Sequence, residues 1–160
     1  LDVTEEYNGT SWSEQNNLNT ARYGFSGAGL QTSALAFGGV QSPPTISNDT
    51  EEYNGTSWTS VNDMAQPAFN HGGSGAQTAA LQFGGQTGSN TGGSKTNATF
   101  GYDGTNWSTR PSMATTRSQI SGSSGTSNIS AAAFGGTIAP YSAATEEFTV
   151  AATAKTFTTS

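Results

Sequence analysis

The chain lacks several residue types in amounts that exclude whole classes of protein. It has no cysteine, which excludes disulfides and thiolate metal sites but is compatible with any redox compartment. Lys and Arg together number 5 against 11 Asp and Glu, so the net charge is −6 and no basic stripe is available to neutralise phosphates. No run of 18 apolar residues occurs. We therefore expect no nucleic-acid partner and no membrane insertion.

Residues that carry chemistry are equally scarce. The one histidine, His71, has no cysteine to share a zinc ion with, so we interpret it as structural or as a surface residue. There is no G-x-S-x-G segment, and the Ser, His and Asp spacing gives no catalytic triad. We therefore expect no catalytic residue, no metal and no cofactor, and a protein that is not an enzyme.

Glycine and small polar residues are abundant instead. The chain holds 21 glycines among 160 residues and only 10% charged residues, a composition typical of many short strands joined by tight turns. Disorder is the rival interpretation, because only 32% of the residues are hydrophobic. The aromatic content of 10% and the repeats described next argue against disorder.

Two short segments recur along the chain. The segment TEEYNGTSW occupies residues 4–12 and returns letter for letter at 50–58, 46 residues later. ATFGYDGTNW at 98–107 is a weaker copy, and TEEF at 145–148 is a copy without Trp. The second marker is a diglycine after an apolar run: Gly38 and Gly39, Gly84 and Gly85, Gly135 and Gly136. A period of about 40–50 residues is that of four-stranded propeller blades.

Each period predicts the same order of strands. Asn8-Gly9 between two alternating segments predicts a hairpin with a type I′ turn, and Asn54 and Asp103 precede glycine at the equivalent places. The first unit then has strands at 23–29 and 33–39 and a long loop at 40–49. The second has strands at 69–76, 78–85, 97–103 and 105–109. The third has strands at 118–125, 130–136, 144–150 and 155–159.

The pattern resembles the kelch repeat of β-propellers. A kelch blade reads as Arg, Gly-Gly, Tyr and Trp, which here are Arg22, Gly38-Gly39, Tyr53 and Trp58, then Gly84-Gly85, Tyr102 and Trp107, then Arg117 and Gly135-Gly136. Ala68 departs from the pattern where Arg is expected, and Phe148 replaces the third Tyr. The nine-residue repeat also looks like Gly/Thr-rich kelch-like arrays in structural proteins of marine bacteriophages.

We predict that residues 1–160 form one all-β propeller domain, or part of one, built of kelch-like four-stranded antiparallel blades. Three full blades are expected at 16–62, 63–111 and 112–160, with a half blade at 1–15. The expected fold residues are Tyr7, Tyr53 and Tyr102, the glycine pairs, and Trp12, Trp58 and Trp107, which should pack between adjacent blades. At most one carboxylate of each Glu-Glu pair can be buried, and a buried one should accept hydrogen bonds from an Arg or from backbone.

Three blades and a half do not close a ring. The chain begins at Leu1 rather than Met, which favours a longer array over a ring of several copies. We expect both ends to be covered by other blades of a longer chain, by copies of itself or by other assembly proteins.

Recognition is expected in the loops that vary between units, 40–49, 86–97 and 137–144. The candidate binding residues in them are Asn48, Asp49, Asn90, Lys95 and Tyr141, and their neutral surroundings suit glycans. The alternative is that these loops are only solvated. The leading function is a non-enzymatic structural or adhesion module, a bacteriophage fibre or decoration protein of the virion or extracellular space. A kelch-type adaptor that binds another protein is the alternative, and a glycan-processing enzyme is a third class.

Overall fold

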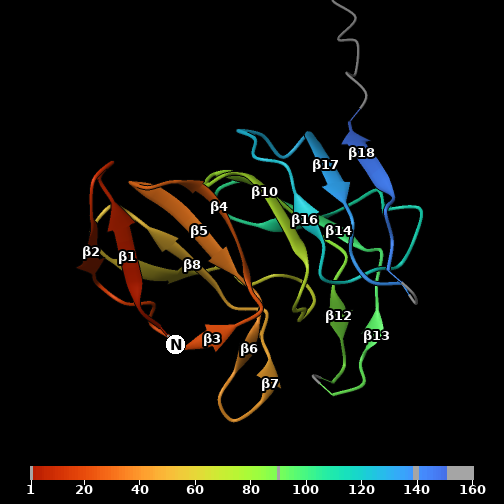
Figure 1. Cartoon of the computed structure of the whole chain (residues 1–160), viewed down its shortest axis with the longest axis horizontal. Helices are drawn as coiled ribbons and strands as arrows, with labels where there is room; N and C mark the ends of the chain where they lie inside the picture. The colour runs from red at the N-terminus through yellow and green to blue at the C-terminus, as the bar shows by residue number, and fades with distance from the viewer. Residues whose placement is uncertain (1, 90, 139–140, 151–160) are drawn as a thin grey trace, which may run out of the picture.

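The computed structural model describes residues 2–89, 91–138 and 141–150, and its regular elements are all β-strands (Figure 1). Each strand pairs only with antiparallel neighbours, and among the described strands no sheet closes on itself. The predicted all-β class is therefore confirmed. The predicted strand 155–159 lies outside the described residues.

Two four-stranded sheets form the centre of the molecule. The first has the order β4-β5-β8-β9, with bounds Ser26–Leu30, Ser33–Phe37, Thr50–Tyr53 and Trp58–Val61. The second has the order β10-β11-β14-β15, with bounds Gly72–Ala76, Ala79–Phe83, Thr99–Tyr102 and Trp107–Arg110. In each sheet the second and third strands are neighbours although a long segment separates them in sequence.

Smaller sheets complete the chain. The N-terminal hairpin joins β1 (Thr4–Tyr7) to β2 (Trp12–Gln15), and a three-stranded sheet joins β16 (Ser121–Gly122), β17 (Ser130–Phe134) and β18 (Thr145–Thr149). The segments between the second and third strands form β6 (Val40–Gln41) with β7 (Thr45–Ile46), and β12 (Gln86–Thr87) with β13 (Ser94–Lys95). β3 (Arg22–Tyr23) pairs with β6.

The predicted hairpins are present, but their turns differ from the prediction. Gly9, Gly55 and Gly104 have φ of +97°, +87° and +93°, whereas the preceding Asn or Asp does not have positive φ. The Asn8 side-chain oxygen instead accepts the amide protons of residues 10 and 11, at 2.9 and 3.0 Å. Asn54 and Asp103 accept the equivalent amide protons in the other two turns. Each turn is thus a four-residue loop closed by the side chain of its first residue, so the type I′ prediction was wrong.

The first strand of each unit starts later than predicted. Gly24, Asn70 and Gln119 occupy equivalent positions and have φ of +64°, +52° and +55°, which bends the chain before β4, β10 and β16. These bends touch one another, because Asn70 N donates to Gly24 O and Gln119 N donates to Asn70 O, each at 2.7 Å. The predicted strands 23–29, 69–76 and 118–125 are therefore shortened, the last to two residues.

Glycines let the first strands lie side by side at the centre of the molecule (Figure 1). A Cβ at Gly73 would lie 3.0 Å from the carbonyl oxygen of Gly27, and a Cβ at Gly122 would lie 2.3 Å from that of Gly73. Backbones that approach this closely leave no room for a side chain.

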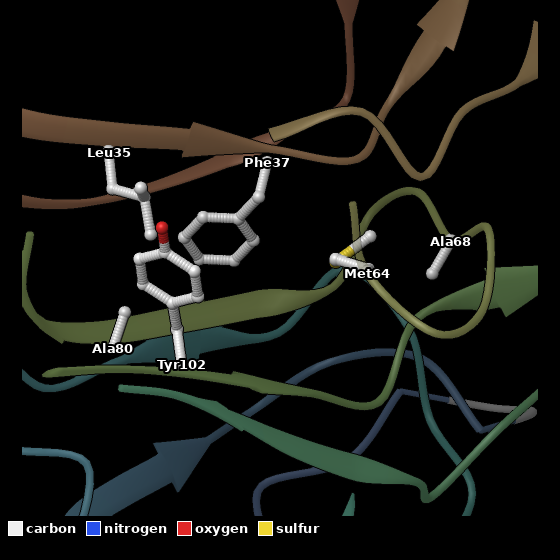
Figure 2. Close-up of a cluster of buried hydrophobic side chains, with 6 residues drawn as sticks. All are labelled: Leu35, Phe37, Met64, Ala68, Ala80 and Tyr102. Atoms are coloured by element: carbon white, nitrogen blue, oxygen red, sulfur yellow. The ribbon is translucent and has the colours of Figure 1, made fainter. Parts of the chain in front are cut away.

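The main core lies between the first and second sheets and has six buried members: Leu35, Phe37, Met64, Ala68, Ala80 and Tyr102 (Figure 2). Figure 2 shows the rings of Phe37 and Tyr102 facing each other from opposite sheets. Burying a side chain such as Phe37 contributes about 1.5–3 kcal/mol. A second core joins Leu81, Phe83 and Ile120 to Ala133 of the third sheet.

His71 is buried against the main core rather than lying at the surface. Its ring stacks on Phe37 with centroids 5.4 Å apart, and burial lowers its pKa to about 4. The position corresponds to Phe25 and Ile120, because each of the three residues meets the second glycine of a Gly-Gly pair. His71 thus acts as a neutral core residue at pH 7, as the structural interpretation expected.

In two of the three Glu pairs, one carboxylate is held by an arginine. Glu51 is buried with Arg22, which also donates to the carbonyl oxygen of Asp49 at 2.9 Å. Glu146 pairs with Arg117 at 3.0 Å, and Arg117 donates to neighbouring carbonyl oxygens as well. At most one carboxylate of each pair is buried, as predicted, and an Arg is the partner at Glu51 and Glu146. In the first pair Glu5 is exposed, and Glu6 accepts a hydrogen bond from Tyr53 in place of an Arg. In the second unit both members of the Arg–Glu ion pair are replaced, Arg22 by Ala68 and Glu51 by Phe100.

The repeated Tyr and Trp form the junctions between units. Tyr53 donates its hydroxyl to Glu6, and Trp58 Nε1 donates to Thr4 Oγ1, both at 2.9 Å. One unit later, Tyr102 donates to Glu52 at 2.9 Å and Trp107 donates to Thr50 at 3.1 Å. Trp58 and Trp107 therefore lie between units as predicted.

Trp12 does not lie between units among the described residues. Trp12 is 66% exposed, and among aromatic rings its indole contacts only Tyr7 of its own hairpin. The same nine letters thus occupy two environments, because the hairpin β1–β2 has a neighbour on one face only.

Candidate functional site

Two hairpins project from the same end of the molecule. β6–β7 and β12–β13 both extend to the lower side of the view, away from the main sheets (Figure 1). Each is inserted between the second and third strands of its sheet, where the sequence predicted variable loops. They differ in length and letters, whereas the sheets that carry them share their register, Phe37 opposite Thr50 and Phe83 opposite Thr99.

An open groove of about 600 Å³ lies between these two hairpins. Eight residues line it: Pro44, Thr45, Ile46, Gln66, Pro67, Thr87, Gly88 and Ser89. None of the eight is charged. Their hydroxyl and amide groups can donate and accept hydrogen bonds, while the two prolines and Ile46 offer apolar surface.

Backbone hydrogen bonds fix the distance between the groove walls. The link that carries Gln66 and Pro67 is fastened to the first hairpin by Ala68 N, which donates to Ser47 O at 3.3 Å. On its other side, Phe69 and Gln86 exchange hydrogen bonds of 3.1 and 2.9 Å. The link therefore forms a floor that joins both walls, so the groove is largely formed before any ligand arrives.

Asn48 and Asp49, two of the predicted binding residues, face the protein. Asn48 Nδ2 donates to Met64 O at 3.0 Å, and Met64 N donates to Asn48 O at 2.9 Å. Asn97 makes the same contact one unit later, 2.8 Å from Met113 O. The Asp49 carboxylate accepts a hydrogen bond from Gln41. These contacts hold the loops in place, and neither residue lines the groove.

The other predicted binding residues lie elsewhere. Lys95 Nζ donates to the carbonyl oxygen of Ile138 at 3.0 Å, which joins the second hairpin to the next loop. Tyr141 pairs with Thr137 in that loop and is 87% exposed. Asn90 lies outside the described residues. The structure thus places Lys95 and Tyr141 on neighbouring loops, beyond the groove.

Sequence reasoning predicted recognition in the two loops that supply six of the eight groove residues, but it named none of the eight and missed the link that supplies the other two. Gln66 and Pro67 belong to a short link between units that carried no signal of its own. Pro43-Pro44 marked the first loop, but nothing in the sequence said that the two hairpins face each other across the link. Only the spatial arrangement brings 44–46, 66–67 and 87–89 together.

The side chains whose pKa values are shifted lie outside the groove. Burial and the Glu52 carboxylate raise the pKa of Tyr102, and amide protons from Asn106 and Thr105 lower that of Asp103. Among residues 2–89, 91–138 and 141–150, His, Asp and Glu form no group of three that could hold a metal ion. In the same residues, no helix is long and apolar enough to cross a membrane.

Neither a scan against models of protein families nor a search of curated proteins gives a match to this chain.

Proposed function

We propose that the chain is part of a kelch-like β-propeller that serves as a non-enzymatic recognition module. In this interpretation the first and second sheets are two blades, the third sheet belongs to a third blade, and the hairpin β1–β2 is half a blade. The repeated Tyr–Glu and Trp–Thr contacts support this assignment, because they stack successive sheets in the same way.

The groove is the proposed binding site, and a neutral glycan is the proposed ligand. The observation that carries this proposal is the lining: hydroxyl and amide groups beside apolar surface, with no charged side chain. A sugar has the matching chemistry, since its hydroxyls need hydrogen-bond partners and its C–H faces need apolar contacts. The volume of about 600 Å³ falls in the range of ligand sites.

The proposed setting is the outside of a bacteriophage particle, where a fibre or decoration protein contacts the host surface. The support for this part is the Gly/Thr-rich repeat style together with a surface poor in lysine. Sequencing the genes beside this one tests it, because genes for virion proteins cluster, and neighbours of unrelated metabolism would contradict it.

A glycan array tests the binding proposal. We expect the chain to bind neutral glycans, and Thr45→Arg to weaken binding at least about 10-fold because an arginine there fills the groove. Thr59→Arg is the matched control, since Thr59 is also an exposed strand threonine but does not line the groove.

Three results would contradict the proposal. Equal binding by both variants would place the ligand elsewhere. Capture of a purified host protein with no glycan bound would favour the adaptor function, and turnover of an oligosaccharide would favour an enzyme.

A further inference from the structure

The two ends of the molecule carry complementary halves of one contact. Inside the chain this contact occurs twice, with a Tyr hydroxyl on a Glu and a Trp indole on a Thr of the preceding unit. At its second occurrence the Trp107 ring also packs edge-on against Phe37, with centroids 5.1 Å apart. The receiving unit therefore supplies a Thr and a Glu at both occurrences, and a Phe as a third group where Trp107 docks.

β17–β18 presents all three receiving groups in the right register. Phe134 lies opposite Thr145, as Phe37 lies opposite Thr50, and Glu147 follows Thr145 as Glu52 follows Thr50. Thr145 and Glu147 are both exposed. Phe134 is 41% exposed, whereas its equivalent Phe37 is fully buried under Trp107.

The hairpin β1–β2 presents the inserting groups. Tyr7 is 48% exposed and Trp12 is 66% exposed, whereas the equivalent Tyr53 is buried. Tyr7 and Trp12 already have the relative placement of the internal pairs, with ring centroids 5.2 Å apart against 4.9 Å for Tyr53 and Trp58. No rearrangement within the hairpin is needed before it docks.

We propose that the hairpin β1–β2 of one copy docks on the β17–β18 face of a second copy. Tyr7 then donates to Glu147, and Trp12 donates to Thr145 while its ring covers Phe134. The occupant is a second copy because the receiving triplet recurs in this same chain in the register that the internal contacts use. The contact is head-to-tail, so it builds a ring if it closes and a filament if it does not.

This inference goes beyond the proposed binding function and does not depend on it. The docking faces contain none of the groove residues, so ligand binding and self-association can fail separately. Binding of a glycan by a monomer would leave the function intact and overturn the docking proposal.

The experiment measures the mass of the full chain by light scattering and sedimentation over a range of concentrations. We expect association that rises with concentration. Trp12→Ala should weaken it at least about 30-fold, the loss that follows from removing a central aromatic anchor. Tyr141→Ala is the matched control, because Tyr141 is an exposed aromatic residue outside both docking faces, and it should associate as the wild type does.

A mixing experiment tests the head-to-tail geometry. Trp12→Ala destroys the inserting face only, and Glu147→Arg destroys the receiving face only, so each variant alone should be monomeric. Mixed in equal amounts, they should form a 1:1 dimer that grows no further. Circular dichroism should match the wild type for both, since both side chains are exposed.

Three outcomes would overturn the proposal. The wild type could remain monomeric at every concentration, which would mean that something other than a second copy covers these faces. Trp12→Ala could associate as well as the wild type. The two variants could also stay monomeric when mixed although each folds normally.

Discussion

Replacing His71 by isoleucine should remove a large part of the acid sensitivity of this protein. His71 is a buried histidine at a position that Ile120 occupies in the third unit and Phe25 in the first. The fold therefore accommodates an apolar residue at this place. Because His71 Nε2 is buried without a hydrogen-bond partner among the described residues, His71→Ile should not destabilise the protein at neutral pH by more than about 1 kcal/mol.

The size of the effect follows from the pKa of His71. It is about 4 in the folded protein, because burial disfavours the charged ring, and about 6.5 in the unfolded chain. Between pH 6.5 and pH 4 the unfolded chain therefore binds a proton that the folded protein does not. The free energy of unfolding falls by about 1.4 kcal/mol per pH unit in this window, or about 3 kcal/mol in all.

Urea unfolding followed by tryptophan fluorescence at pH 7.5, 6, 5 and 4 measures this loss. The wild type should lose about 2 kcal/mol more than His71→Ile by pH 5 and about 3 kcal/mol more by pH 4. Acid also affects Glu146: burial alone would raise its pKa, but hydrogen bonds from Ala114 and Thr115 and the charge of Arg117 lower it. That contribution is common to both proteins and cancels in the difference. A difference that stays constant across the four pH values would refute the reasoning.

Two further predictions concern buried contacts. Glu51→Gln should lower the free energy of unfolding by about 3–5 kcal/mol, because it leaves Arg22 buried without its carboxylate. The double variant Arg22→Ala with Glu51→Phe copies Ala68 and Phe100 of the second unit and should lower it less. Thermal denaturation compares the two, and a double variant less stable than Glu51→Gln would contradict this. Gly84→Ala should destabilise the protein by about 2 kcal/mol or more, since φ is +63° and a Cβ there would lie 2.8 Å from a backbone carbonyl oxygen. A urea titration compares it with Gly88→Ala, which carries the same positive-φ strain but has open space around its Cβ and should therefore cost less.

The repeated residues predicted most of the fold. In its copy at 50–58, TEEYNGTSW carries a hairpin, a buried glutamate and two junction side chains in nine letters, and its first copy builds the same hairpin. The Gly-Gly pairs likewise marked the ends of β5, β11 and β17. Local pattern is a sufficient guide where the same contacts recur with each period.

The sequence did not predict features that depend on a single neighbour in space. Asn8 suited a type I′ turn, but its side chain closes a longer loop by accepting two amide protons. Asn48 and Asp49 looked like loop residues available to a ligand, yet Asn48 holds the loop to the link that follows β9, and the Asp49 carboxylate accepts a hydrogen bond from Gln41 within the loop. The groove depends on two hairpins that lie 46 residues apart in equivalent units and face each other only when their sheets stack.

The identity of residues 4–12 and 50–58 also bears on how such a chain can change its length. A recombination event that joins any point in the first copy to the matching point in the second deletes 46 residues and leaves one intact copy. The surviving copy still offers its Thr and Glu to Trp107 and Tyr102, because those contacts use letters that both copies share. A gain or loss of a whole unit in one step would therefore preserve the Tyr–Glu and Trp–Thr contacts at the remaining junction, although a loss removes the Phe37 contact of Trp107, and each such step would add or remove one projecting hairpin.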